Sequence, residues 1–144
     1  MNLEFDPCFD QKKIIKISAH LPKTYAELNR LAPFRRGRWP TKIHCMSDSK
    51  VIEGRMRGAG HGYTYPGKNG IWMNHNMTTT GYWLVLVHES LHHAWPDATE
   101  KELNCRYVPR IYEAVFGKVL TPEFGRRHGL GSPLPGMGDR SFCR

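Results

Sequence analysis

The sequence predicts an α+β domain in which a short, twisted β-sheet packs against a histidine-bearing helix that pairs with a second helix. Short β-prone runs separated by turn residues precede residue 75, and two helical patterns follow. The length of 144 residues suits one domain, and a hydrophobic fraction of 40% is sufficient for a core. We place this domain at residues 1–120. Residues 121–144 are rich in Gly, Pro and Arg without periodicity, which predicts a C-terminal arm or tail.

The first half of the chain contains one helical pattern and two strand patterns. Thr24 and Glu27 have the spacing of a capping box, which predicts a helix over residues 24–31. Residues 41–46 alternate polar and apolar side chains and predict a strand, and residues 50–57 are a second candidate.

A hairpin and a longer helix are expected next. The turn sequence PGKNG at residues 66–70 predicts a β-hairpin whose second arm is residues 71–74. A helix then begins near Thr80, after hydroxyl side chains that suit an N-cap. Its core-facing stripe consists of Leu84, Val87, Leu91 and Trp95.

A second helix is expected to fold back over the first. Pro96 ends the first helix, and Asp97 with Glu100 repeats the capping-box spacing that starts another. This helix runs to about Gly117, with a disturbance at Pro109. The two helices then form an αα-hairpin.

His88, Glu89 and His92 form an H-E-x-x-H motif within the first of these helices. Positions i and i+4 lie on one face of a helix, so both imidazoles can bind one Zn²⁺. Glu89 projects beside them, where it can act as general base toward a water whose pKa zinc lowers to about 7. The motif therefore predicts His88 and His92 as zinc ligands and Glu89 as catalytic base.

A catalytic zinc site normally takes a third protein ligand, and the hairpin indicates where it lies. Residues equidistant from Pro96 face each other across the turn. Glu100 then lies opposite His92 and is the expected third ligand. Asn104 lies opposite His88, where its side chain can orient the ligand histidine through a hydrogen bond.

Other carboxylates and histidines remain open as the third ligand. Asp97 is the first alternative because it lies close to the site, although it points along the helix end. Further alternatives lie on the second helix, beside the motif or in the C-terminal segment: Glu102, Glu113, His93 and His128. Glu100 also has a second interpretation as the capping-box carboxylate, and it cannot fill both roles at once. Likewise, two half-buried histidines on an ordinary amphipathic helix are the alternative to a zinc pair.

HESLH at residues 88–92, EKELN at 100–104 and GIWMN at 70–74 carry a resemblance to a known family. The first segment matches the core motif of the zincins, the H-E-x-x-H zinc metallopeptidases. EKELN resembles the E-x-x-A-(D/N) segment that supplies the third ligand in their glutamate-ligand branch, with Leu103 in place of the usual alanine. GIWMN is similar to their active-site strand. The order is most like the ImmA/IrrE-type intracellular peptidases and covers residues 70–117.

The resemblance implies a minimal zincin-like domain with one catalytic zinc. Its ligands would be His88, His92 and Glu100, with Glu89 as catalytic base. The substrate peptide would lie in extended form along an edge strand.

The formal net charge of +8 indicates an anionic partner, and nucleic acid is one candidate. Residues 1–60 carry twelve Lys or Arg and residues 101–144 carry eight. Residues 61–100 contain only Lys68 but hold five of the eight histidines. The scarcity of fixed cations around these histidines favours a site for a divalent metal.

The sequence gives no indication of a membrane or an exported protein. The longest apolar run, residues 82–87, is too short to span a bilayer, and residues 1–10 lack the layout of a signal peptide. The four cysteines show neither C-x-x-C pairs nor dense spacing: Cys8, Cys45, Cys105 and Cys143. We therefore expect reduced thiols and a cytoplasmic protein.

Two functions from different classes fit these features. The first is a zinc-dependent peptidase that acts on a protein or peptide substrate. The second is a non-catalytic basic module that binds nucleic acid on a zincin-like scaffold, and an SprT-like peptidase acting on DNA-bound protein would combine the two. His61, Tyr63 and Tyr65 on the hairpin are candidates for stabilising an oxyanion, although cross-strand aromatic packing is their expected role.

Overall fold

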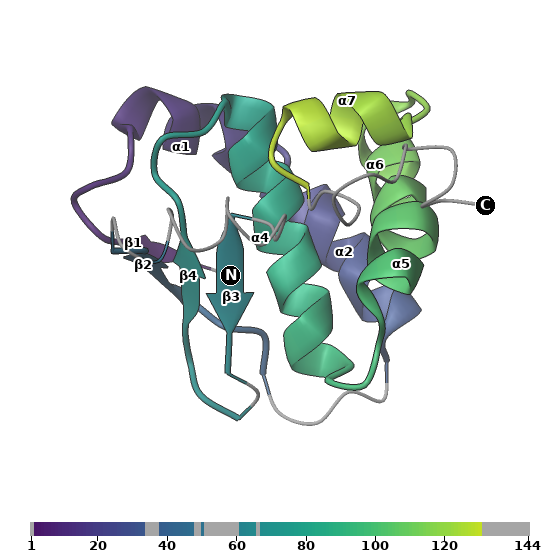
Figure 1. Cartoon of the computed structure of the whole chain (residues 1–144), viewed down its shortest axis with the longest axis horizontal. Coiled ribbons are helices and arrows are strands. Elements are labelled where there is room, and N and C mark those ends of the chain that lie inside the picture. The colour runs from purple at the N-terminus through teal and green to yellow at the C-terminus, as the bar shows by residue number, and fades with distance from the viewer. Residues whose placement is uncertain (1, 34–37, 48–49, 51–60, 66, 131–144) are drawn as a thin grey trace.

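The computed structural model describes residues 2–33, 38–47, 50, 61–65 and 67–130, which form a mixed α+β structure (Figure 1). In chain order the elements are β1 (Glu4–Phe5), α1 (Gln11–Ser18), α2 (Leu21–Leu31), β2 (Lys42–Cys45), β3 (Gly62–Thr64), β4 (Ile71–Met73), α4 (Thr79–Ala94), α5 (Glu100–Glu102), η1 (Leu103–Tyr107), α6 (Val108–Phe116) and α7 (Pro122–Arg127). Helix α4 lies between the sheet and the layer that contains α2 and α6.

The sheet has the strand order β1-β2-β4-β3. β1, β2 and β4 run parallel, with Ile43 beside Ile71. β3 is antiparallel to β4 and pairs Tyr63 with Trp72. The predicted strand at residues 41–46 and the predicted hairpin are therefore confirmed as β2 and as β3 with β4. Because β3 is the last strand of the sheet, one of its edges is unpaired among the described residues.

Helix α4 is buried almost all round. Thr78 caps it, since its Oγ1 accepts a hydrogen bond from the Gly81 N–H at 3.0 Å. Every residue from 81 to 91 is buried. The predicted stripe of Leu84, Val87 and Leu91 is thus only part of the buried surface, because the sheet and the other helices enclose α4 from several sides.

The second helix of the hairpin consists of α5, η1 and α6 in succession. It ends where the sequence predicts, at Gly117, whose φ of 69° is the left-handed conformation that favours glycine at this position. The interruption near Pro109 is also present and takes the form of η1.

Helix α2 begins three residues before its predicted start, at Leu21, with Pro22 in its first turn. Thr24 is fully buried within the helix and accepts a hydrogen bond from Trp83 Nε1 at 2.9 Å. The predicted capping box of Thr24 and Glu27 is wrong, because the Thr24 hydroxyl is used in the core rather than at a helix end.

The C-terminal segment begins with regular structure. Helix α7 is capped by Thr121, and Leu130 beyond it is buried in the core. His128 Nδ1 lies 2.7 Å from Thr78 Oγ1, which ties this segment to the start of α4. Residues 131–144, and residues 51–57 of the second predicted strand, lie outside the described residues.

Cys8 and Cys45 form a disulfide, with their Cα atoms 6.4 Å apart. The parallel pairing of β1 and β2 brings these two positions together. Cys105 is disulfide-bonded as well. The expectation of reduced thiols is therefore wrong, and since disulfides are rare in the cytosol, this finding does not favour the cytoplasmic prediction.

The described part of the chain contains no helix with the length and apolar character needed to cross a membrane.

Candidate metal centre

His88, Glu89 and His92 project from the second half of α4, near β3. The side chains of His88 and Glu89 are buried, and that of His92 is partly exposed. The two imidazole rings lie with their centroids 4.6 Å apart, as the i, i+4 spacing on one helix face predicts. The packing of α4 therefore fixes both imidazoles next to each other.

Glu100 is the first residue of α5 but does not cap it. The cap is Thr99, whose Oγ1 accepts a hydrogen bond from the Glu102 N–H at 3.0 Å. The Glu102 carboxylate in turn accepts from the Thr99 N–H at 3.3 Å. The predicted capping box of Asp97 and Glu100 is wrong, because the real box lies two residues further along. The Glu100 carboxylate is therefore available for contacts with α4.

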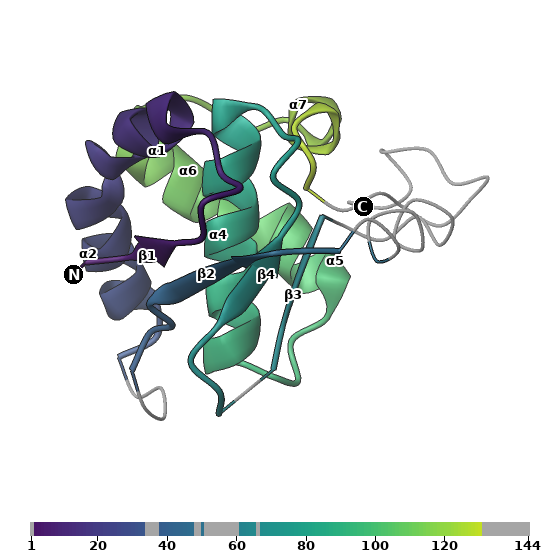
Figure 2. The same cartoon turned by 90° about the vertical axis from the view of Figure 1, so that its left-hand side faces the viewer.

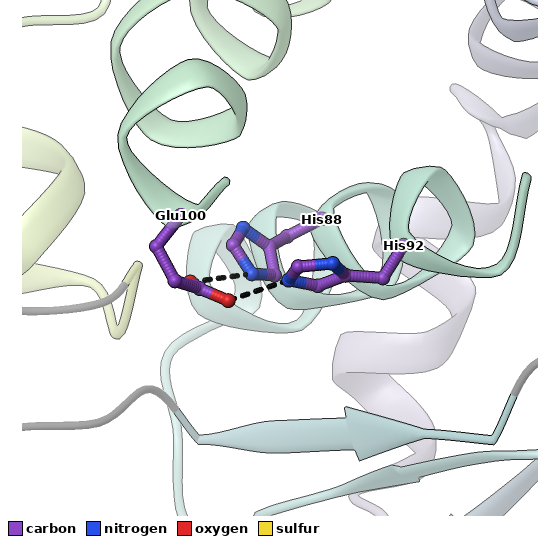
Figure 3. A group of neighbouring side chains, drawn as sticks. All are labelled: His88, His92 and Glu100. Carbon is purple, nitrogen blue, oxygen red and sulfur yellow. Dashed lines mark hydrogen bonds and ion pairs between the residues drawn. The ribbon is translucent and has the colours of Figure 1, made fainter. Parts of the chain in front are cut away.

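Glu100 reaches across the hairpin to both histidines, as Figure 3 shows. Its Oε1 lies 2.5 Å from His92 Nε2, and its Oε2 lies 3.0 Å from His88 Nε2. Glu89 Oε1 lies 3.8 Å from His88 Nε2. The contact between Glu100 and His92 is the one that symmetry about Pro96 predicts.

His88, His92 and Glu100 form a group that could hold a metal ion. Each offers one ligand atom, and these atoms lie within 4.8 Å of one another. Two imidazole nitrogens and a carboxylate oxygen are a donor set that suits zinc and several other divalent metals. Protein packing alone does not require this convergence, since the Glu100 side chain is 57% exposed.

The pKa values of the two carboxylates of the site, Glu89 and Glu100, are shifted in opposite directions. Burial alone would raise the pKa of Glu100, but hydrogen bonds and positive charge from His88 and His92 hold it well below the usual range. Burial raises the pKa of Glu89, and the charge of Glu100 adds to this rise against the attraction of the histidines. Glu100 is thus kept ionised beside His88 and His92, whereas burial makes Glu89 more ready to accept a proton.

Residues of both helices affect the pKa of His88. Burial alone would lower its pKa, but the hydrogen bond to Glu100 and the charges of Glu89 and Glu100 raise it overall. Asn104 adds to this rise, although its contact with the imidazole falls outside hydrogen-bond geometry. His88 Nδ1 and both polar atoms of the Asn104 side chain are buried without a hydrogen bond to any described residue. Asn104 therefore lies where it was predicted, while the expected hydrogen bond is not formed.

Asn104 belongs to η1, a widened helical turn. In this turn the Val108 N–H donates to the carbonyl five residues before it, at Leu103, instead of four. Pro109 follows directly and has no N–H to continue the regular pattern, which accounts for the interruption at this point. Such π-helical turns are rare and often occur at functional sites.

A cleft of about 280 Å³ opens beside the group, and its wall includes the edge strand β3. Its lining residues are Gly62, Tyr63, Thr64, Glu89, His92, Pro96 and Glu100. β3 can approach α4 because Gly62 has no side chain. A Cβ there would lie 2.5 Å from Val85 Cγ1 and 3.2 Å from Glu89 Cγ. Gly62 was not among the residues predicted for the site, because its only signal in the sequence is a glycine at the start of a β-prone run.

Within the described residues, the alternative third ligands do not join the group. Asp97 and Glu113 are exposed, and Glu102 is held in the capping box with Thr99. His128 lies at the opposite end of α4 from the group, beside Thr78.

The hairpin aromatic residues pack as expected. The rings of Tyr63 and Trp72 are stacked, with centroids 5.4 Å apart and an angle of 2° between their planes. Tyr65 meets the same tryptophan edge-on at 5.3 Å. His61 Nδ1 lies 3.0 Å from Asn74 Nδ2. Tyr63 also borders the cleft, but its ring is engaged on the sheet.

Comparisons of the chain with protein-family models, with curated proteins and with solved structures found no match. The structural support for a metal site is therefore the convergence of His88, His92 and Glu100.

Proposed function

We propose that the protein is a zinc-dependent metallopeptidase. The observation that carries this proposal is the convergence of His88, His92 and Glu100 on one point beside the buried carboxylate of Glu89. A general base placed next to three metal ligands is the arrangement needed to hydrolyse an amide bond with an activated water.

Each residue has a defined task in this proposal. His88, His92 and Glu100 hold the ion, and a bound zinc supplies Lewis acidity that polarises a carbonyl and lowers the pKa of water. Glu89 takes the proton from the attacking water and later delivers it to the leaving amine. Burial raises the pKa of Glu89 above its usual range, so this carboxylate accepts a proton more readily than an exposed one.

The substrate is proposed to bind as an extended peptide along β3. This strand has one unpaired edge among the described residues and borders the cleft with Gly62, Tyr63 and Thr64. An extended peptide can add to such an edge through main-chain hydrogen bonds. Its scissile carbonyl would then lie beside Glu89 and His92.

Metal analysis of the purified full chain tests the proposal most directly. The wild type and Glu89→Gln should each carry about one zinc per chain, whereas His92→Ala and Glu100→Ala should carry little. His93→Ala is the matched control, because this neighbouring histidine does not join the group and its loss should leave the zinc in place. Wild-type protein that binds no zinc in the absence of chelator would refute the proposal.

The peptidase step requires a second measurement. Peptide mixtures incubated with the wild type should yield cleavage products detectable by mass spectrometry, and Glu89→Gln with its zinc retained should lower the rate by about 10²–10⁴-fold. A zinc-loaded Glu89→Gln variant that cleaves at the wild-type rate would exclude Glu89 as the base.

A further inference from the structure

The sheet carries a group of rings on the face opposite α4. This aromatic face consists of His44 on β2, Trp72 on β4, Tyr63 on β3 and Tyr65 just beyond it. Alternate residues of a strand point to opposite faces, so the buried neighbours Ile43, Ile71 and Met73 point toward α4, and the rings point away. Figure 2 shows the strands with α4 behind them.

The rings form one continuous surface across three strands. Trp72 is at its centre and contacts Tyr63 at 5.4 Å, Tyr65 at 5.3 Å and His44 at 5.0 Å between ring centroids. The Trp72 ring lies over Gly70, where a Cβ would come within 3.0 Å of it. Tyr65 is nearly half exposed, at 48%, and none of the four residues is buried.

Lysines surround this face. Lys68 Nζ lies 5.6 Å from the centroid of the Tyr65 ring. Lys50 acts electrostatically on Tyr63. Lys42 is exposed two residues before His44, and therefore on the same face of β2. Among the described residues, the Asp6 carboxylate also approaches these rings, with its Oδ2 3.2 Å from His44 Nδ1.

We infer that the aromatic face binds single-stranded nucleic acid. Exposed rings on a sheet offer stacking surfaces to unpaired bases, and nearby lysines attract the phosphates between the bases. The chain as a whole has a formal net charge of +8, which favours the same class of polyanion. Duplex bases are already stacked on each other, so the rings distinguish single strands from duplexes.

This binding surface does not depend on the metal centre. Tyr63 belongs to the aromatic face and also borders the cleft, so a bound strand would lie alongside the site where a peptide is proposed to be cleaved. If the purified wild type binds no zinc, the peptidase proposal is refuted, but the nucleic-acid proposal is unaffected.

The test is fluorescence anisotropy of a labelled twelve-nucleotide oligo-dT titrated with the full chain at several salt concentrations. Tyr65→Ala should weaken binding about five- to 150-fold, which is the range for losing one stacked base, while Tyr65→Phe should bind like the wild type. Lys68→Gln should reduce the slope of log affinity against log salt by about 0.7. Lys23→Gln is the matched control, since it removes the same charge from an exposed position on α2, which contributes no residue to the aromatic face.

Three results would overturn the inference. Equal affinities of the wild type for oligo-dT and for an abasic strand of the same length would show that the rings contribute no stacking. Equal effects of Lys68→Gln and Lys23→Gln would show that only overall charge matters. Salt-independent binding of a neutral oligosaccharide, without binding of oligo-dT, would assign the rings to another ligand class.

Discussion

Replacement of Gly62 by alanine tests the closest approach between the sheet and the helix that carries the metal ligands. The φ angle of Gly62 is not positive, so the backbone accepts alanine and the effect is one of contact alone. The new Cβ would lie 2.5 Å from Val85 Cγ1, whereas carbon atoms in contact normally lie about 3.5–4.0 Å apart. The shortfall is about 1 Å in a buried region, and overpacking of this kind costs about 1–3 kcal/mol.

Urea unfolding followed by circular dichroism measures this cost as a lower midpoint with an unchanged slope. The same substitution in a Val85→Ala background should cost about 1 kcal/mol less, because the atom it would strike has been removed. Since the added Cβ also lies 3.2 Å from Glu89 Cγ, peptide hydrolysis should fall while zinc is retained. An unchanged midpoint, or an equal cost in both backgrounds, would refute the contact between β3 and α4.

Four further predictions concern the metal centre and the disulfide. The Asn104 amide and His88 Nδ1 are buried without hydrogen-bond partners among the described residues, and we expect zinc binding to bring the two side chains into contact. Asn104→Ala should then weaken zinc binding about 10- to 100-fold in a chelator competition, and unchanged affinity would exclude that role. His88 has a raised pKa and must lose its proton to bind zinc, so zinc affinity should rise with pH until that pKa is passed; a flat pH profile would contradict this. The contribution of His88 to the stability of the metal-free protein has the opposite sign: it is complete below the unfolded-state pKa and is lost as pH rises through the folded-state pKa. The double variant Cys8→Ser, Cys45→Ser should lose about 4 kcal/mol of unfolding free energy, given a sequence separation of 37, and a loss near zero would show that the bridge does not constrain the unfolded chain.

The local parts of the site could be predicted because they depend on spacing along one element. His88 and His92 share a face of α4 at any position in a fold, and the turn sequence before β4 fixes the hairpin. The contact between Glu100 and His92 could also be predicted from local sequence. A short turn at Pro96 makes the second helix run back along the first, which brings these two residues together.

The cap of the second helix could not be predicted with the same certainty. Asp97 with Glu100 and Thr99 with Glu102 both have the spacing of a capping box, and both begin next to the turn. The structure uses the second pair. With this pair as the cap, the Glu100 carboxylate contacts His88 and His92 on the other helix. No local sequence pattern contains such a contact between helices.

Contacts between segments that lie far apart in the chain could not be predicted from the sequence. The parallel pairing of β1 with β2 joins segments almost forty residues apart and creates the Cys8–Cys45 bridge. Gly62 acquires its importance only when β3 is laid against α4. The miss of α1 at residues 11–18 was different, because its signal is local: the Asp10 carboxylate caps the helix by accepting hydrogen bonds from the N–H groups of Lys12 and Lys13.

The widened turn η1 behaves like a one-residue insertion in the second helix. Each residue of a regular helix turns the chain by about 100°, so closing η1 into regular α-helix would rotate everything after it by roughly that angle relative to Glu100. Glu100 faces α4 before the turn, and Val108, Ile111 and Val115 are buried in the core after it. A regular α-helix of the same length would therefore turn either Glu100 or the core residues away from their partners, whereas deleting one residue within η1 would let a regular helix keep both. The widened turn thus allows one helix to present Glu100 to α4 and its apolar residues to the core.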